Sequence, residues 1–386
     1  MKLRKPAMPP ASYFATVVVA ALLLVLGNRV VNQKAFTLDD AEIIRARALA
    51  VVRVDKDNYS EDDPTLVMTT VTFDAKALSG RHKGQTLRCV QMVDNMYGLA
   101  LSQVKAGDAV LLDVLHTDDG AYEYTLLDFV RTGPLILLGL LFSALLILLG
   151  RKKGANTLLS FALSLMAIFF VLVPALLAGR STYGWSMLTC VYIVVTNLLI
   201  VQGPSKKVAA AGLGCLGGVL CSGLIMLLVN RPMHITGLME EESIYLKAMG
   251  IDIRAIAFCM ILVGSVGALM DVAMDIAAAL HELRESNRGI GAGELLRSGL
   301  NIGQDLIGTM ANTLILAYIG ESMSFLLLMI YYSANAAHMM NREIISVAIL
   351  QCLAGCLSVL AVVPLTSFIC SRLYTGKPKV VRYEAG

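Results

Sequence analysis

Carboxylates inside apolar sequence are the residues of this chain whose positions could support chemistry. Asp271 and Asp275 lie four positions apart in one apolar stretch, so they share one face of a helix. The next apolar stretch carries Asp305, Asn312 and Glu321. A charged side chain in hydrocarbon costs about 2.5 kcal/mol or more. We therefore expect these side chains to turn toward a shared interior, where they could bind a proton, an ion or a polar solute.

Further residues of the second stretch extend this candidate site. Asp305, Thr309 and Asn312 fall on one helical face, and Gly308 would let a neighbouring helix approach closely. Glu321 belongs to a Gly-Glu-Ser step inside an apolar run, which can mark a helix break that lines a cavity. The predicted substrate- or ion-binding residues are Asp271, Asp275, Asp305, Thr309, Asn312 and Glu321.

Two of these acids also have structural explanations, which stay open at this point. Asp305 could cap the beginning of its helix, where the helix dipole favours a negative charge. Asp275 could be hydrated near the membrane surface, or paired with Arg284 or Arg288. Asp271 has no such explanation, because the predicted spans contain no basic residue inside them that would neutralise it; Lys207 stands only at the first position of one span.

Composition identifies the elements that must position these residues as membrane helices. Hydrophobic residues make up 56% of the 386 and charged residues 16%, which excludes a soluble globular domain of this length. A helix that crosses a bilayer needs about 20 apolar residues. Eight stretches approach or exceed this length, which predicts a polytopic α-helical membrane protein: 11–27, 132–150, 157–178, 184–201, 207–229, 255–280, 306–330 and 344–370.

Basic residues predict the orientation of the chain. Lys2, Arg4 and Lys5 precede the first stretch, and Lys and Arg are richer in every second loop and in the tail after residue 372. We expect a bacterial cytoplasmic membrane protein with both termini in the cytoplasm. The first stretch could be a cleaved secretory signal, but it lacks a clear small-x-small cleavage site, so a retained anchor is favoured.

One soluble domain is predicted between the first two spans. Alternating runs at 65–73, 86–92, 109–115 and 122–127 indicate strands, separated by glycine-containing turns. The expected fold is a small β-rich extracytoplasmic domain, an OB-like barrel of five strands. Its mixed charges do not indicate nucleic-acid binding, and it could serve as a sensor, a docking site or a structural cap. The predicted division is 1–27 for the first helix, 28–130 for this domain, 131–372 for seven further helices and 373–386 for a basic tail.

Small residues recur every four positions in the stretch 207–229, where Gly214 and Gly218 form a smooth stripe. Such a stripe lets helices pack closely, and it would also permit one helix to slide past another. Gly289, Gly291 and Gly293 only superficially resemble a phosphate-binding loop, and a flexible turn is the expected structure.

Cysteine and histidine usage predicts neither a cofactor nor a metal site. Of eight cysteines only Cys89 falls in the soluble domain, so no disulfide is expected within it. Cys352 and Cys356 share a helical face, but in lipid they behave as small apolar residues. The histidines form no cluster with ligand spacing, so the identity of any metal stays unknown.

Two runs carry a resemblance to a known family. GALMDVAMDIAAALHEL and ELLRSGLNIGQDLIGTMANTLILAYIG resemble the YibE/F family of bacterial multi-pass membrane proteins. The resemblance covers roughly residues 262–320 specifically, and the matching positions are Asp271, Gly303, Asp305, Gly308, Thr309, Asn312 and Thr313. It implies an architecture and candidate positions but no substrate. The chain departs from the expected pattern at Gln304, where a basic residue is more usual, and at Asp275, where a small polar one is.

Three functions fit these observations. The first is a secondary transporter or channel subunit that uses the carboxylates, since the chain has no ATP-binding motif. The second is a non-enzymatic sensor, scaffold or permease subunit; for either, the partners would be the lipid bilayer and another copy or a related membrane protein. The third is an intramembrane aspartyl protease that uses Asp271 and Asp305, although no GxGD motif surrounds the second acid.

Overall fold

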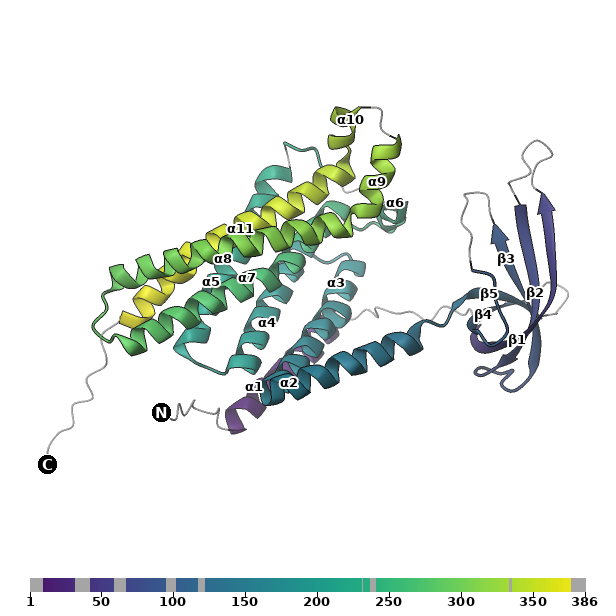
Figure 1. Ribbon diagram of the computed structural model, residues 1–386, viewed down its shortest axis with the longest axis horizontal. Coiled ribbons are helices and arrows are strands. Elements are labelled where there is room, and N and C mark those ends of the chain that lie inside the picture. The colour runs from purple at the N-terminus through teal and green to yellow at the C-terminus, as the bar shows by residue number, and fades with distance from the viewer. Residues whose placement is uncertain are drawn as a thin grey trace. The chain divides into compact units, whose positions relative to one another are not determined.

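A computed structural model of the chain describes residues 10–31, 42–58, 67–94, 102–116, 122–230, 232–236, 241–332 and 335–375 (Figure 1). The chain divides into two compact units. The barrel unit comprises Phe36–Leu145, and the helical unit combines Met1–Ala35 with Leu146–Gly386.

The barrel unit contains five strands that close into a barrel, as predicted. The strand order is β1-β2-β3-β5-β4, and all neighbours are antiparallel except β3 and β5, which run parallel. The strands are β1 (Glu42–Asn58), β2 (Val67–Ala77), β3 (Thr86–Asp94), β4 (Ala109–His116) and β5 (Tyr122–Phe129). The runs singled out in the sequence correspond to β2 to β5. They do not include β1, in which register shifts after Ala48 and Val51 interrupt the alternation of side chains.

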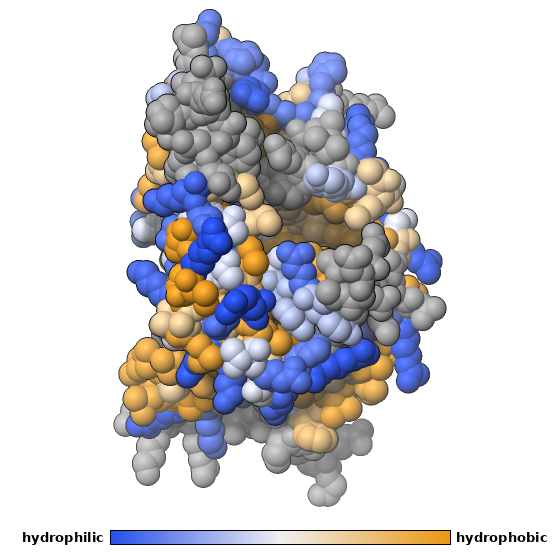
Figure 2. Space-filling view, turned by 90° about the vertical axis from the view of Figure 1, so that its right-hand side faces the viewer, coloured by the Kyte–Doolittle hydropathy of each residue, from blue (hydrophilic) through white to orange (hydrophobic). Residues whose placement is uncertain are grey.

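A small apolar core fills the barrel. Ile44, Phe73, Cys89 and Leu112 come from four different strands, and each is fully buried. Burial, together with the nearby negative charge of Asp74, raises the pKa of the Cys89 thiol to about 12. Hydrophilic side chains cover much of the barrel surface in the space-filling view, with apolar patches between them (Figure 2).

The barrel surface carries short-range ion pairs typical of a domain in water. Arg88 faces Asp74 across β2 and β3, with Nε 3.1 Å from Oδ1, and this hydrogen bond and charge raise the pKa of Arg88. Arg131 lies 2.7 Å from Asp128, and its hydrogen bond lowers the pKa of that carboxyl.

Helices make up the second unit, with α2 beginning in the barrel unit. They are α1 (Pro10–Val31), α2 (Thr132–Ala167), the π-helix η1 (Ile168–Leu172), α3 (Val173–Leu177), α4 (Thr182–Gln202), α5 (Lys206–Asn230), α6 (Glu241–Ala248), α7 (Ile253–Ser286), α8 (Ala292–Glu321), α9 (Met323–Tyr332), α10 (Ala336–Met340) and α11 (Glu343–Thr375). The turn that contains Gly289 and Gly291 joins α7 to α8, in agreement with the predicted turn.

By length and composition, six helices of the described residues could cross a membrane, or seven if α8 and α9 form one bent span. This supports a multi-pass membrane protein. One of the six is the 46-residue stretch Thr132–Leu177, which at the rise of an α-helix would measure about 69 Å. A break with positive φ at Arg151 divides it, at the boundary between the predicted spans 132–150 and 157–178. The prediction of eight spans counts these halves separately.

Glycines allow α5 and α8 to pack closely on α11. A Cβ atom on Gly214 would overlap Thr366, and one on Gly218 would overlap Val362, so the stripe seen in the sequence lies against a neighbouring helix. Gly303 of α8 has the same relation to Val363. These contacts, together with α7, enclose the main apolar core of the unit.

Helix α1 packs against other helices of the helical unit, and its retention as an anchor stays a prediction. Ala20 and Leu24 are buried together with Val171 and other residues of η1, α2 and α4. The Tyr192 hydroxyl of α4 donates a hydrogen bond of 3.2 Å to the carbonyl oxygen of Ala20.

Candidate functional site

Helix α7 presents two opposite faces. Leu269, Val272 and Ile276 have no exposed surface and lie in the main core. Asp271 and Asp275 lie on the other face and are exposed. The expectation that both acids point into the interior of the bundle does not hold for the single chain, because the helix turns its apolar side inward and its carboxylates outward.

Helix α8 is divided in the same way. Gly299 and Gly303 are buried against α11, whereas Asp305, Thr309 and Asn312 are exposed. Around the helix axis, at 100° per residue, Asp305 and Asn312 lie almost opposite Gly303. The outward residues Asp271, Asp275, Asp305, Thr309 and Asn312 are called the polar faces of α7 and α8 below.

The two helices that carry the polar faces are neighbours within the helical unit. Leu280 of α7 lies against Gly299 of α8, where an added Cβ atom would approach it to 2.9 Å. Nearer the other end of α8, a Cβ atom on Gly264 would lie 2.9 Å from the Tyr318 hydroxyl. Gly264 is itself exposed on α7, so its missing side chain leaves room for Tyr318.

The polar groups on these faces differ in how they are satisfied. The Thr309 hydroxyl donates to the carbonyl oxygen of Leu306 at 3.0 Å, and Thr313 donates to that of Thr309 at 2.9 Å. Such bonds within a helix let a hydroxyl face lipid. Among the described residues, the carboxylates of Asp271, Asp275 and Asp305 have no hydrogen bond or ion pair, so the acids are the groups that need a partner or water.

The two structural explanations for the acids can now be assessed. The capping explanation for Asp305 is wrong, because α8 begins at Ala292 with Gly291 as its N-cap, and Asp305 lies well inside the helix. The explanation that Asp275 pairs with Arg284 is not supported. The Arg284 guanidinium donates instead to the carbonyl oxygens of Arg288 and Ile290, the latter at 2.8 Å.

Glu321 lies at the helix break that its sequence context predicted. Helix α8 ends at Glu321, and α9 begins two residues later at an angle of 60°. The Glu321 side chain is exposed. Glu321 does not line the cavity described below, and its role in binding stays a prediction.

Gly308, the remaining predicted packing residue, lies in a different environment from Gly214 and Gly218. An added Cβ atom on Gly308 would meet no atom within 4 Å, so this glycine leaves room on the outward side of α8.

All eight cysteines are free thiols, Cys352 and Cys356 included. Within the described residues, no three His, Cys, Asp or Glu side chains gather as metal ligands. Asp271 and Asp305 share no hydrogen bond there, and no observation favours the protease hypothesis.

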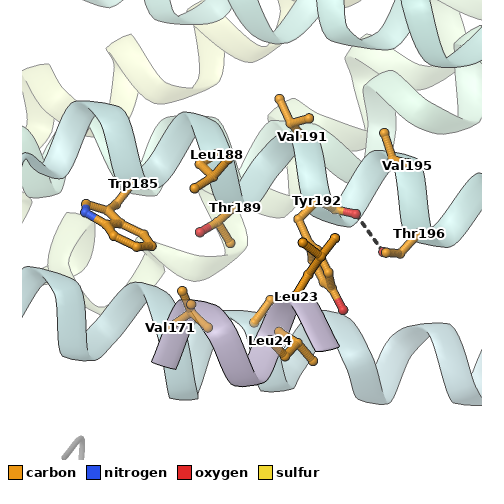
Figure 3. A pocket seen from close by; sticks show the side chains of 12 residues that line it. Leu23, Leu24, Val171, Trp185, Leu188, Thr189, Val191, Tyr192, Val195 and Thr196 are labelled. Atoms are coloured by element: carbon orange, nitrogen blue, oxygen red, sulfur yellow. Dashed lines mark hydrogen bonds between the residues drawn. The ribbon is translucent and has the colours of Figure 1, made fainter. Parts of the chain in front are cut away.

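A cavity of about 250 Å³ lies elsewhere, between α1, η1 and α4 (Figure 3). Leu24, Val171, Trp185 and Tyr192 are among the residues that line it, and none of the predicted site residues does. Sequence reasoning did not find this cavity, because its lining residues look like any apolar membrane helix.

Comparison with known proteins identifies the family of the chain. Neither curated proteins nor solved structures give a match. A family model described as YibE/F-like protein matches residues 138–376, which include α4 to α11 and are more than half of the sequence. The same segment carries both polar faces and the glycines that pack α5 and α8 on α11. The chain therefore belongs to the YibE/F-like family.

Proposed function

We propose that the chain is one subunit of a membrane transporter or channel, in which a second membrane protein covers the polar faces of α7 and α8. The observation that carries this proposal is the outward position of Asp271, Asp275 and Asp305 on two candidate membrane helices whose opposite faces are buried. A polar passage would then lie between subunits.

The cost of exposed carboxylates in hydrocarbon supports this arrangement. One acid at the centre of a membrane helix costs about 2.5 to 3.5 kcal/mol on insertion scales, so three would cost roughly 8 to 10 kcal/mol. That sum is comparable to the whole free energy of unfolding of a typical protein, about 5 to 15 kcal/mol. Water, protonation or a partner must offset it, and a hydrated seam between two subunits supplies all three.

The chemistry of the polar faces favours protons or cations as the translocated species. The three acids are joined by the neutral ligand groups of Thr309 and Asn312, and no lysine or arginine lies among them. Carboxylate and amide oxygens suit hard cations, and buried carboxylates can carry protons. The partner in this proposal is a second copy or a related membrane protein.

The proposed orientation follows from the charges of the loops. Both termini would lie in the cytoplasm of a bacterium, and the barrel would lie outside the cytoplasmic membrane. The strand order and the parallel pairing of β3 with β5 support the OB type for this barrel.

Proton flux into proteoliposomes tests the role of the acids. With the full chain, a pH-sensitive dye inside and an imposed membrane potential, we expect Asp271→Asn to reduce flux by about tenfold or more. Glu282→Gln is the matched control, because Glu282 is exposed on the same helix in the polar segment after the apolar stretch. Uptake of sodium, potassium and manganese ions would be measured in the same proteoliposomes. Equal flux through wild type and Asp271→Asn for every tested species would contradict the proposal.

Photocrosslinking tests the position of the second subunit. Leu316 follows Asn312 by one turn on the outward side of α8, whereas Leu220 lies on α5, and both side chains are 60% exposed. Benzoylphenylalanine at Leu316 should give a crosslinked protein adduct in membranes, and the same probe at Leu220 should give lipid adducts. Equal protein crosslinking at the two positions would remove the polar faces as a specific interface.

A role as sensor or scaffold is the second candidate, and one observation favours it. Among the strands that the structure describes, the second half of β1 pairs with β2 alone, and it exposes Leu49, Val51, Val52 and Val54. An apolar strand with one free edge is a surface that a partner strand could extend. If removal of residues 35–125 abolishes complex formation but leaves ion flux intact, the barrel acts in assembly and the helices in transport.

A further inference from the structure

The cavity between α1, η1 and α4 has the shape of a slot. Its lining residues on α4 run from Trp185 to Thr196 at helical spacing, on one side of the helix (Figure 3). Eleven residues of α-helix span about 16 Å. A volume of about 250 Å³ distributed over this length makes a narrow channel, which suits one extended chain and not a compact ligand.

The walls of the slot are apolar. Leu23 and Leu24 reach it from α1, Val171 from η1, and Leu188 from α4 (Figure 3). The polar groups near Thr196 are already satisfied, because the Thr196 hydroxyl donates to the carbonyl oxygen of Tyr192 at 2.6 Å. The Tyr192 hydroxyl donates to Ala20. Because its lining is almost entirely apolar, the slot suits an apolar occupant, and an empty slot of this kind would stay dry.

The slot opens toward the outer surface of helices that could span a membrane. Leu23 of α1 and Leu188 and Val195 of α4 line it and are also exposed. Both helices qualify as spans by length and composition. A chain from the surrounding lipid can enter the slot sideways without crossing water.

A positive charge lies in the turn that joins the two walls. Leu177 ends α3, which continues η1, and Thr182 begins α4, so Arg180 stands between them. The backbone N–H of Arg180 donates to the carbonyl oxygen of Ala175 at 3.1 Å, which fixes the turn to the first wall. Among the described residues no carboxylate pairs with Arg180, so its charge is available for a phosphate at the Trp185 end of the slot.

We infer that this slot binds one acyl chain of an anionic phospholipid, with the phosphate held near Arg180. The ligand is a structural lipid that fills the gap between α1 and α4 and so holds the first helix on the rest of the unit. This inference is independent of any transport through the polar faces, because none of their residues lines the slot.

Fluorescence of Trp185 provides a direct test, since it is the sole tryptophan of the chain and lines the slot. Purified full-length protein in detergent would be titrated with phosphatidylglycerol that carries dibrominated acyl chains, which quench tryptophan on contact. We expect quenching that saturates at one lipid per chain. Quenching that rises without saturation, or no quenching, would overturn the inference.

Variants on opposite walls show whether the quencher enters the slot. Thr189→Phe on α4 and Val171→Phe on η1 would each occupy part of it, and both should weaken saturable binding by about tenfold. Leu220→Phe on the exposed side of α5 is the control and should bind as wild type. Equal binding by all folded variants would place the lipid outside the slot.

Two further arms identify the source of the acyl chain. Arg180→Gln should weaken binding of brominated phosphatidylglycerol by about fivefold, the range of a lost charge-assisted hydrogen bond. Brominated stearate should bind wild type more weakly than the phospholipid. If stearate binds as tightly and Arg180→Gln has no effect, the phospholipid assignment is wrong.

Discussion

The packed and outward sides of α8 carry the same residue type with opposite consequences. Gly303 lies against Val363 of α11 so closely that a Cβ atom would overlap it, whereas Gly308 meets nothing within 4 Å. The packed side is explained by the helices of this chain, but the outward side, with Asp305 and Asn312, is not. This difference between the two sides of α8 is the basis of our proposal that a second membrane protein covers the outward side.

The comparison also separates stability from function. Side chains on the packed side contribute to the fold of the single chain, because they exclude lipid and fill space. Those on the outward side contribute nothing to that packing, so their polarity has to be explained by what they meet in the membrane. Three substitutions follow from this division, and a fourth, in the barrel unit, provides a reference.

The largest effect is expected for a side chain added on the packed side. Gly303→Leu must displace Val363 or separate α8 from α11, which should lower the free energy of unfolding by about 3 kcal/mol or more. Denaturant titration in detergent, followed by circular dichroism, measures this. Gly308→Leu is the matched control, with a change within about 1 kcal/mol. Similar losses for both would end the distinction between the two sides.

A smaller effect is expected for a single buried hydrogen bond on the packed side. The Tyr374 hydroxyl of α11 donates to the carbonyl oxygen of Ala277 on α7 at 3.1 Å, and both residues are buried. Tyr374→Phe should lower the free energy of unfolding by about 1 kcal/mol. Tyr245→Phe, on exposed α6, should leave it unchanged in the same titration. No difference between the two variants would show that this bond is not made.

Removal of an outward carboxylate should have almost no effect on the single chain. Asp305→Leu takes away an exposed side chain that makes no hydrogen bond or ion pair with the described residues, so the free energy of unfolding in detergent should change by less than about 0.5 kcal/mol. Crosslinking from Leu316 in membranes should fall in the same variant if the acid helps to hold a partner. A large loss of stability would mean that Asp305 contributes to the fold of the single chain.

The smallest effect is expected for the Asp128–Arg131 pair on the barrel surface. Asp128 is an exposed carboxylate with a basic partner, and it serves for comparison with the unpaired acids of α7 and α8. The Arg131 hydrogen bond lowers the pKa of Asp128, so this pair stabilises the barrel above about pH 4 and loses its effect as the pH falls through the lowered pKa. Arg131→Gln should therefore lower the melting temperature slightly at pH 7 and not at pH 2. A difference that persists at pH 2 would assign the effect to packing.

The sequence predicted the large features because each has a strong physical signature. Long apolar runs indicated the helices that could span a membrane, and alternating runs indicated four of the five strands. The break after Glu321 followed from glycine and polar residues inside an apolar run. The strand β1 was missed because its bulges interrupt the alternation that identifies strands.

The direction in which the acids point could not be predicted. Periodicity placed Asp271 with Asp275 on one face, which the structure agrees with, but a single sequence does not say whether a polar face turns toward its own bundle or outward. The glycines of α8 indicate the direction, since Gly299 and Gly303 pack against α11 and lie opposite Asp305 and Asn312. A small-residue stripe opposite an acidic one indicates which side packs.

The barrel contains a single cysteine, Cys89, and its burial determines how the folded domain responds to an oxidising environment. Cys89 is sealed among strands and holds its proton far above neutral pH, so it has almost no reactive thiolate and is inaccessible to another sulfur. The domain can therefore mature in an oxidising environment without forming mixed disulfides. Once the barrel has folded, burial alone protects this thiol.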